Sequence, residues 1–395
     1  MLNNLLVIGN NWIYQVEDQY YGYPQWYFFS RYFTKYFQTV SIMAPVKQTK
    51  TLKGLPLKDT QIFPLPFIDG SVDLLKKSYL LPRIVYQYFK RIPKFDVVFI
   101  FNSDPASTLG LWFSTIFKKH CVYFIGEDWE KDIIEKYPHK IPQFVFLLMM
   151  RFLRYIQFKL LRKKGMIFVT NQSLLSQYKN IPFPVCPYFL SLVSEQDIIA
   201  KEPRQIHEKD EVRLLYTGFL VRGKGVQDLI EAISLLRESG FPYQLRVDIV
   251  GDGDFREELE KLAKEKGLKQ IRFHGFIGDR NDIKKLYLES DVFILPSRSE
   301  GVPKVLFEAM CYGTAIIVTN VGGVPTVIRD GYNGLLVPAG EPHSLSETVR
   351  KLIVDNELRQ NLIANGYDFV KQHTAEMAAK QMYQVLEEVF FLDRH

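Results

Sequence analysis

Two glutamates, Glu300 and Glu308, flank the start of an expected helix, which is a position where proteins often bind anions. An expected strand at 291–295 leads into the loop that holds Glu300, and Pro303 stands where the next helix would begin. Proline favours the first helical position because that position needs no N–H donor. A helix start carries free N–H groups and partial positive charge, so this segment is predicted to bind an anion such as a phosphate.

Glu308 lies about five residues into the expected helix, or about 8 Å along its axis at about 1.5 Å per residue. That length is close to the separation of the pyrophosphate and the ribose in a nucleotide. Glu300 is expected to accept hydrogen bonds from hydroxyls on the other side of the phosphates. The alternative is a pair of solvated glutamates beside an ordinary helix, and the neighbouring glycines, the proline and the Glu308-Ala309-Met310 sequence disfavour it.

A second anion-binding segment follows an expected strand at 212–217, where the loop 216–225 carries Gly218 and leads into a helix. Arg222 and Lys224 stand close to the start of that helix. Two cations there would stabilise a diphosphate as negative charge develops on the leaving oxygen. The alternative is that both are solubilising loop residues.

Two other motifs in the second half are not expected to carry chemistry. Residues 251–256 resemble a dinucleotide fingerprint, but Arg256 replaces its third glycine, so no nicotinamide cofactor is predicted. Asp252 and Asp254 have a spacing that other transferases use for a divalent metal. We interpret this stretch as a structural turn and predict no metal site. His274 closes an expected strand and is interpreted as a packing residue.

Strands and helices alternate in both halves of the chain, which is typical of parallel sheets covered by helices on both faces. We therefore predict an α/β protein with two doubly wound domains. Such sheets bind ligands outside the carboxyl ends of their strands, so two facing domains would form an active site in the cleft between them. The expected strands are 4–8, 40–43, 96–101, 121–125 and 166–170 in the first half, and 212–217, 244–250, 271–274, 291–295, 315–319 and 334–337 in the second.

The two halves differ in charge, so we expect them to have different partners. Residues 1–200 contain 24 Lys and Arg against 14 Asp and Glu, a net charge of +10. Residues 201–395 contain 26 against 30, a net charge of −4. The basic half would suit phosphates or an anionic membrane surface. Nucleic acid is not expected, because none of the known binding modules is present.

The domain boundary is predicted near 190–211, because the preceding stretch is rich in proline and 195–211 is polar without a strand pattern. We assign residues 1–195 to the first domain and 212–374 to the second. A C-terminal helix at about 375–392 is expected to pack back on the first domain.

The segment 141–165 mixes apolar and basic side chains at helical intervals, and from Lys136 to Ser194 there are nine Lys or Arg and no acidic residue. Such a helix suits the surface of an anionic bilayer, where each cation adds about 1 kcal/mol. The alternative is a buried helix with a solvated basic end. No apolar run approaches the ~20 residues of a spanning helix, so an integral membrane protein is not expected.

Three scattered cysteines, Cys121, Cys186 and Cys311, exclude a disulfide framework and a multi-cysteine metal site. They favour a reducing compartment, and no secretory signal is recognised at the N-terminus. We expect a cytoplasmic protein, with a peripheral contact at the inner face of the plasma membrane as the expected role of 141–165.

The second half resembles the nucleotide-binding domain of the retaining glycosyltransferases of family 4, the group 1 glycosyltransferases. The signature is present as Glu300-Gly301-Val302-Pro303, Glu308-Ala309-Met310, Gly313 and Gly322-Gly323, with similar segments at 250–253, 274–276 and 330–337. The resemblance covers about residues 212–390, whereas the first half is similar only in its order of strands and helices. It implies the GT-B fold, in which two Rossmann-like domains face each other across a cleft.

The resemblance also implies roles for individual residues. Glu308 would bind the ribose hydroxyls, and Glu300 would hold and position the transferred sugar. Lys224 would neutralise the diphosphate, helped by Arg222, since Phe219 stands where the family usually has an arginine. The remaining donor-binding residues that it implies are Gly301, Val302, Pro303, Lys304, Val305, Gly218, Phe276 and Gly22. Many relatives place a histidine after the strand at 121–125; this chain has Glu127 and Asp128 there, which are the expected acceptor-binding residues.

The implied function is the transfer of a hexosyl or N-acetylhexosaminyl group from a UDP-sugar or GDP-sugar to an acceptor hydroxyl, without an obligatory metal. The acceptor is expected to be a lipid-linked or surface polysaccharide intermediate. Two alternatives remain. One is a sugar-nucleotide epimerase of the same fold, for which acid and base residues around the sugar are not found. The other is a non-catalytic sugar-binding subunit, which the presence of Glu300, Glu308 and Lys224 disfavours.

Overall fold

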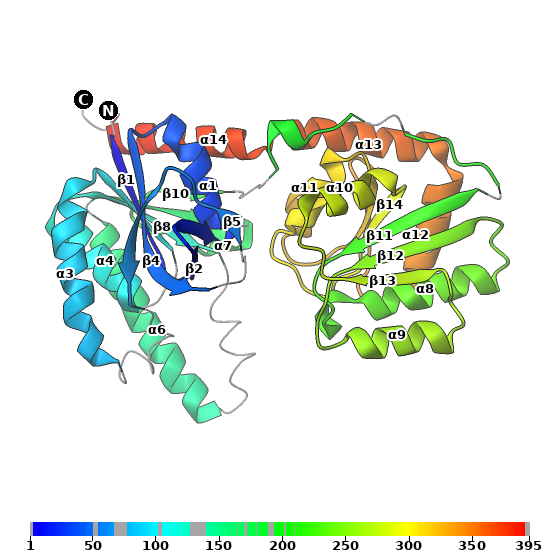
Figure 1. Cartoon of the computed structure of the whole chain (residues 1–395), viewed down its shortest axis with the longest axis horizontal. Helices are drawn as coiled ribbons and strands as arrows, with labels where there is room; N and C mark the ends of the chain where they lie inside the picture. The colour runs from blue at the N-terminus through cyan, green and yellow to red at the C-terminus, as the bar shows by residue number, and fades with distance from the viewer. Residues whose placement is uncertain are drawn as a thin grey trace. The chain divides into compact units, whose positions relative to one another are not determined.

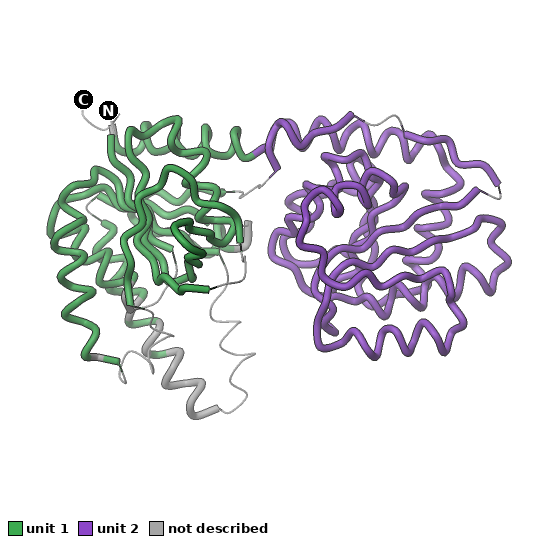
Figure 2. The backbone as a smooth tube through the Cα atoms, viewed as in Figure 1, with its two compact units in different colours: residues 1–192, 375–395 green, residues 193–374 purple. Residues whose placement is uncertain are grey.

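The chain folds into two compact units, one formed by Met1–Leu192 with Ala375–His395 and the other by Val193–Thr374 (Figure 2). Figure 1 shows the computed structural model with its helices and strands labelled. No helix in the described part of the chain is both long and apolar enough to cross a membrane. The structure describes residues 3–49, 54–66, 77–101, 105–126, 140–162, 164–169, 172–178, 180–188, 193–200, 203–208 and 210–391.

The first unit is built on a parallel sheet in the order β6-β4-β1-β7-β8-β9-β10, flanked by a small antiparallel extension. The extension begins with β2, which runs parallel to the far end of β4, and continues through β3 and β5. The strands are β1 (Asn4–Ile8), β2 (Ile13–Val16), β3 (Gln19–Gly22), β4 (Thr39–Gln48), β5 (Leu55–Pro56), β6 (Gln61–Leu65), β7 (Val97–Phe101), β8 (His120–Ile125), β9 (Gly165–Val169) and β10 (Val185–Pro187).

Helices cover both faces of this sheet, because successive residues of its central strands point to opposite sides. In β1, Leu5 and Val7 join one buried cluster, and Leu6 and Ile8 join the other. The first cluster is covered by α1 (Pro24–Tyr32), η1 (Phe33–Lys35) and α14 (Ala375–Phe391). The second is covered by α3 (Leu81–Arg91), η3 (Ile92–Lys94), α4 (Pro105–Ile116), α6 (Lys140–Leu161) and α7 (Gln172–Gln177), and η2 (Ser78–Leu80) directly precedes α3.

The C-terminal helix α14 belongs to the first unit, although the chain reaches it from the second. Its buried face consists of apolar residues at helical spacing, Ala378, Met382, Leu386 and Phe390, which join the core formed by α1 and the sheet. The ring of Tyr383 stacks on Tyr36 with centroids 4.8 Å apart.

The second unit is a six-stranded, all-parallel sheet in the order β13-β12-β11-β14-β15-β16 (Figure 1). The strands are β11 (Glu211–Thr217), β12 (Gln244–Val250), β13 (Ile271–Gly275), β14 (Val292–Leu295), β15 (Ala315–Thr319) and β16 (Leu335–Val337). One layer of helices contains α8 (Val226–Glu238), α9 (Arg256–Glu265) and α12 (Pro342–Val354), and the other contains α10 (Arg280–Glu289), α11 (Lys304–Cys311) and α13 (Asn356–Lys371). The order of the strands reverses between β11 and β14, and doubly wound sheets bind ligands at such a point.

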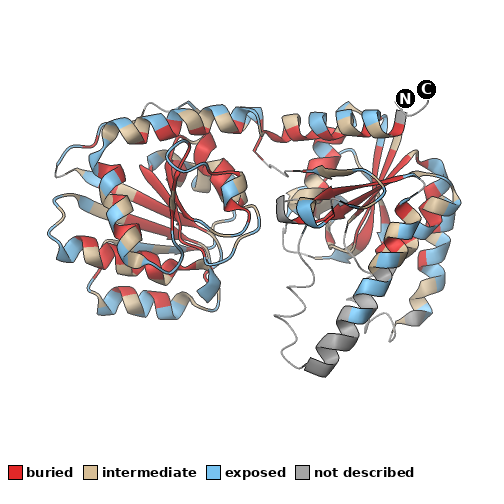
Figure 3. Cartoon of the chain, turned by 180° about the vertical axis from the view of Figure 1, so that it is seen from behind, coloured by how far each residue is buried: buried red, intermediate tan, exposed pale blue. Residues whose placement is uncertain are grey.

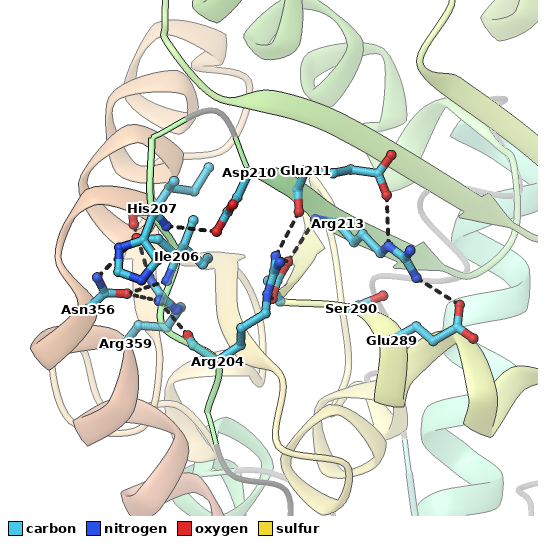
Figure 4. Close-up of polar contacts among 12 residues, drawn as sticks. Arg204, Ile206, His207, Asp210, Glu211, Arg213, Glu289, Ser290, Asn356 and Arg359 are labelled. Carbon is cyan, nitrogen blue, oxygen red and sulfur yellow. Dashed lines mark hydrogen bonds and ion pairs between the residues drawn. The ribbon is translucent and has the colours of Figure 1, made fainter.

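The second unit starts at Val193, earlier than the predicted residue 212, because the polar stretch before β11 is bonded to α13 (Figure 4). The side chain of Asn356 accepts a hydrogen bond from Ile206 N at 3.0 Å and donates one to Ile206 O at 3.2 Å. Arg204 pairs with Asp291 at 2.8 Å. Arg359 is 1% exposed and donates to the carbonyl oxygens of Arg204, Leu352 and Ile353 at 2.9–3.0 Å. The stretch is therefore an integral part of the unit rather than a free linker.

We predict that Arg359→Met lowers the free energy of unfolding by about 3 kcal/mol, because it leaves buried carbonyl oxygens without a donor. Chemical denaturation of the full chain measures this loss. Lys351→Met, which removes an exposed cation in the neighbouring helix α12, is the control and is expected to be nearly neutral. Equal stability of the two variants would contradict the prediction.

Candidate functional site

Most of the predicted donor-binding residues of the second unit follow the carboxyl ends of β11 and β14, whereas Phe276 follows β13. The loop after β11 contains η5 (Arg222–Lys224) and leads into α8. The loop after β14 leads into α11, whose N-cap is Pro303. Because these two strands are hydrogen-bonded neighbours, their loops come together although 76 residues separate Lys224 from Glu300.

Glu300 is held by two donors. Lys224 Nζ donates to its Oε1 at 2.8 Å, and Ser297 Oγ donates to the same oxygen at 2.6 Å. The side chains of Glu300 and Lys224 are 9% and 26% exposed, so the pair lies at the edge of the solvent. Among the described residues no donor is bonded to Glu300 Oε2. That oxygen keeps its capacity to accept a hydrogen bond.

Two glycines allow the loops of the site to approach closely. Gly225 has φ +68°, and a Cβ there would lie 1.9 Å from Pro296 O. Gly322 has φ +52°, and a Cβ there would lie 1.8 Å from Glu300 O. The next residue, Gly323, donates its N–H to Glu300 O at 3.2 Å. Glycine adopts such backbone angles without steric cost. The backbone of the loop after β15 is thus in direct contact with the backbone of the loop that carries Glu300.

A third contact fixes the loop after β14 to α8. Arg298 forms a bidentate ion pair with Asp228, in which Arg298 Nη2 lies 3.0 Å from Asp228 Oδ1. The backbone N–H of Arg298 also donates a hydrogen bond to Gly223 O at 2.8 Å. The two loops are therefore joined by backbone and side-chain bonds as well as by the Lys224–Glu300 pair.

Glu308 lies in the second turn of α11 and is half-buried. Tyr287 of α10 donates to Glu308 Oε2 at 3.2 Å, and Thr217 at the end of β11 lies 2.8 Å from the same tyrosine oxygen. Burial raises the pKa of Glu308, while the hydrogen bond from Tyr287 and the positive charges of Arg280 and Lys304 oppose that rise. Burial also lowers the pKa of Lys304, and Glu308 opposes this shift.

The start of α11 has no side-chain cap. Pro303 provides no side-chain cap, so the first N–H groups of the helix are not capped by that residue. A Cβ added at Gly301 would meet no heavy atom within 4 Å, which means that free space adjoins this backbone. An anion placed there would meet the positive end of the helix and the ammonium group of Lys224 on the neighbouring loop.

Residues 198–369 match the family model described as "Glycosyl transferases group 1". We call the second unit, which this match spans almost entirely, the group 1 domain. An "uncharacterized glycosyltransferase" of Methanocaldococcus jannaschii is 33% identical over 175 residues, covering 44% of this chain and 48% of that protein. The lipopolysaccharide core biosynthesis glycosyltransferase LpsE of Rhizobium meliloti is 30% identical over 171 residues, covering 43% and 48%. The matches thus span about half the length of these relatives.

The fold of the whole chain is also that of known glycosyltransferases. The crystal structure of Anabaena Alr3699/HepE in complex with UDP matches 98% of this chain and 100% of its own, with a TM-score of 0.68 and 17% identity. At that identity the likeness concerns the fold. It confirms the predicted GT-B fold with two Rossmann-like units in one chain.

Some residues that the sequence predicts for the donor site of the group 1 domain have other contacts in the structure. The guanidinium of Arg222 lies over the ring of Phe255, 4.8 Å from its centroid. Phe276 follows β13 and is 80% exposed. Gly218 follows β11, where a Cβ would lie 2.8 Å from the hydroxyl of Tyr216. Val302 and Val305 are half-buried and pack against the core of the domain.

The predicted residues of the first half belong to the other unit or are not described. Gly22 ends β3, and a Cβ there would lie within 3 Å of Trp26, so its lack of a side chain is needed for packing. Glu127 and Asp128 lie outside the described residues.

The two motifs discounted from sequence have structural contacts in the group 1 domain. Asp252 accepts a hydrogen bond from Gly253 N at 2.9 Å, and its backbone oxygen accepts one from Leu220 N at 3.0 Å. His274 Nε2 lies 2.7 Å from Asp248 Oδ1. In the described ranges no group of three His, Cys, Asp or Glu side chains is arranged to hold a metal ion.

Sequence reasoning missed three residues of this site: Ser297, Tyr287 and Thr217. Ser297 is buried and stands three residues before Glu300, so its position in the loop was a usable signal. Thr217 and Tyr287 are 70 residues apart. No local pattern distinguishes them from other residues of a buried strand and an amphipathic helix.

We predict that Gly322→Ala destabilises the group 1 domain by 2 kcal/mol or more, as an order-of-magnitude estimate, because its Cβ would overlap Glu300 O in a left-handed backbone. Gly301→Ala in the same site is the matched control. It is expected to keep the melting temperature of the natural protein, since free space surrounds its Cβ. Thermal unfolding of both variants measures the difference, and a stable Gly322→Ala would contradict the close approach of the two loops.

Proposed function

We propose that this protein is a retaining glycosyltransferase of the family 4 type, which moves a hexosyl or N-acetylhexosaminyl group from a UDP-sugar or GDP-sugar to an acceptor hydroxyl. The observation that carries the proposal is the Lys224–Glu300 pair beside the start of α11, with Glu308 one turn further along the same helix. The match of residues 198–369 to the group 1 family model supports it.

The donor is proposed to bind along α11. Glu308 accepts hydrogen bonds from the ribose hydroxyls, since an ionised carboxylate offers two acceptor oxygens. The N–H groups of Lys304 and Val305 bind the diphosphate together with Lys224. Gly301, Val302 and Pro303 give it room, because a larger residue than Gly301 would fill the free space there. Gly218, Phe276 and, from the first unit, Gly22 complete the donor site in this proposal.

Glu300 is proposed to hold the transferred sugar through its free oxygen. Lys224 carries three N–H donors, so it can keep its bond to Glu300 while it binds a phosphate oxygen. Arg222 supplies a second positive charge once it leaves the ring of Phe255. Lys224 and Arg222 have these roles because the leaving diphosphate acquires negative charge in the reaction.

In the proposed reaction the bond from the anomeric carbon to the phosphate oxygen breaks, and the acceptor oxygen bonds to the same face of that carbon. The proton of the acceptor hydroxyl passes to the leaving phosphate, so no protein nucleophile is required. We propose that no metal is obligatory, because Lys224 and the helix start provide the positive charge that the diphosphate needs. Activity in the presence of a chelator tests this point.

The second unit is proposed to bind the nucleotide sugar, and the first unit to bind the acceptor, with Asp128 or Glu127 contacting its hydroxyls. We propose a lipid-linked or surface polysaccharide intermediate as the acceptor. The name of LpsE, which places that relative in lipopolysaccharide core synthesis, supports this class. So does the surface of the first unit.

The outer surface of α3, α4 and α6, with η2, carries a concentration of exposed apolar side chains. Of the fifteen large hydrophobic residues that are exposed in the described part of the chain, nine lie on these four helices. Exposed sides of the helices of this unit are pale blue in Figure 3. The nine are Tyr79, Val85, Tyr86, Phe89, Trp112, Ile116, Leu148, Phe152 and Tyr155.

The charge of this surface is of one sign. The sequences of α3, α4 and α6 contain no Asp or Glu, while Arg83, Lys90, Arg151 and Lys159 are exposed on them. Exposed aromatic rings beside cations suit the interface of an anionic bilayer. We propose that this surface, which includes segment 141–165, binds the inner face of the plasma membrane peripherally and that the protein is cytoplasmic.

The donor proposal is tested with radiolabelled UDP- and GDP-sugars, with and without membranes as a source of acceptor. Label is expected to appear in a membrane-extractable glycan. Inversion at a ring carbon without transfer would identify the epimerase alternative, and binding without turnover would identify the sugar-binding subunit. A thermal-shift panel of nucleoside diphosphates accompanies it, because a ligand of the native state raises the melting temperature.

We predict that Lys224→Met lowers kcat by about 100-fold, since it removes positive charge from the leaving diphosphate. Lys285→Met on α10 removes an exposed cation of the same domain and is expected to leave kcat unchanged. Steady-state kinetics of both variants measure the effect. A Lys224→Met enzyme with natural kcat would exclude Lys224 from the reaction.

We predict that the double variant Phe89→Ser, Trp112→Ser binds anionic vesicles at least about tenfold more weakly than the natural protein, because two exposed rings no longer leave water. Sedimentation with phosphatidylglycerol vesicles measures binding, and phosphatidylcholine vesicles are expected to bind poorly throughout. Val354→Ser, Tyr332→Ser removes exposed apolar side chains from the second unit and is the control. Equal binding by all three proteins would contradict the proposed surface.

A further inference from the structure

Three side chains from three different elements form a chain of hydrogen bonds that ends at Glu308. Thr217 closes β11, Tyr287 belongs to α10, and Glu308 belongs to α11. Thr217 Oγ1 lies 2.8 Å from the tyrosine oxygen, and that oxygen lies 3.2 Å from Glu308 Oε2. Thr217 is 7% exposed and Tyr287 is fully buried, so the chain runs from the interior of the domain to the half-buried carboxylate.

The chemistry of the groups fixes the direction of these bonds. An ionised carboxylate accepts hydrogen bonds and donates none. The single hydroxyl hydrogen of Tyr287 therefore points to Glu308, and the hydroxyl of Thr217 donates to Tyr287. A bond whose acceptor is charged is stronger than one between neutral groups, and the bond behind it strengthens it further.

Tyr287 is itself rigidly held. Its ring packs between Phe293 and Tyr312, with centroid distances of 5.6 Å and 5.5 Å. Its backbone oxygen accepts a hydrogen bond from Thr314 Oγ1 at 3.1 Å. A hydroxyl on such a ring has one position, so a carboxylate bonded to it has a defined direction.

An ordinary buried tyrosine needs one hydrogen-bond partner, and Thr217 alone would satisfy Tyr287. The additional contact with Glu308 is not required for that purpose. It serves the carboxylate, which loses solvation in this position and gains a donor in return.

We propose that Tyr287, supported by Thr217, is a positioning residue that fixes the direction and the charge of the Glu308 carboxylate for binding the ribose of a nucleoside diphosphate. This inference rests on the proposed donor site. It adds that the affinity for the nucleotide and its dependence on pH are set in the interior of the domain, at a hydroxyl that does not touch the ligand.

The groups around Glu308 determine the sign of the pH dependence. Burial raises the pKa of Glu308; the Tyr287 hydrogen bond, Arg280 of α10 and Lys304 of α11 lower it, while Asp197 of η4 (Glu195–Asp197) raises it. The carboxylate must be ionised to accept bonds from the ribose hydroxyls. Affinity is therefore full above the pKa of Glu308 and falls as the pH drops through it. Loss of the Tyr287 hydroxyl moves this fall to higher pH.

The test is Tyr287→Phe in the full chain, with dissociation constants of UDP and GDP measured by calorimetry between pH 5 and 8. For the nucleotide that binds, we expect about tenfold weaker binding near the acidic end and a midpoint higher by about one pH unit. Thr217→Val is expected to shift the midpoint in the same direction by a smaller amount. Tyr367→Phe, which removes another tyrosine hydrogen bond of this domain, to Ile199 O at 2.7 Å, is the control and is expected to leave the midpoint unchanged.

A second measurement separates positioning from a loss of stability. The natural protein is expected to prefer a nucleoside diphosphate over its 2′-deoxy form, and Tyr287→Phe is expected to reduce that preference by about fivefold. A Tyr287→Phe protein with lower melting temperature but natural midpoint and natural ribose preference would overturn the proposal. If the natural protein itself binds neither UDP nor GDP, the donor site proposed above fails, and this inference fails with it.

Discussion

Parallel pairing of β11 with β14 is the constraint on which the candidate donor site depends. Leu214 pairs with Val292 and Leu215 with Phe293, although the chain passes through β12 and β13 between these two strands. Both strands therefore end at the same edge of the sheet, at the point where the strand order reverses. Their loops meet there, and Gly225 and Gly322 let backbone oxygens approach where any side chain would collide. The ion pair between Lys224 and Glu300 results from that meeting.

The ionisable groups of the site have protein partners before any ligand is considered. Glu300 is bonded to Lys224 and Ser297, and Glu308 is bonded to Tyr287. Burial disfavours the charged form of a carboxylate, and hydrogen-bond donors offset that cost. The partners keep each group in a defined direction and leave one carboxylate oxygen and the start of α11 for a ligand. The interior of the domain thus fixes these side chains, while groups at the carboxyl edge of the sheet keep hydrogen-bonding capacity.

The first unit shows a different use of the same amino acids. Its strands bury aromatic rings on both faces, as with Phe99 and Tyr123, while the helices α3, α4 and α6 expose aromatic rings on their outer surface. The exposed rings are not members of the buried clusters of this unit, and the sequences of the three helices contain no acidic residue. The same helices therefore bury one set of side chains in the core and expose another set on the outside.

The sequence by itself determined the central strands and the start of α11, because these depend on neighbours within a few residues. Runs of branched apolar residues predicted 244–250 and 315–319 with the bounds that the structure has. Pro303 located the start of α11 to within one residue. The sequence did not predict β2, β3, β5, β6 and β10, which have two to five residues and are strands only through their pairing. Nor did it assign 193–210 to the second unit, since the partners of this stretch, Asn356 and Arg359, stand about 150 residues later. The sequence did not predict the contact between Tyr287 and Thr217 either, since these residues are 70 positions apart. A hydrogen bond between distant residues needs the whole fold to bring its two atoms together, and only the tertiary structure decides which atoms those are.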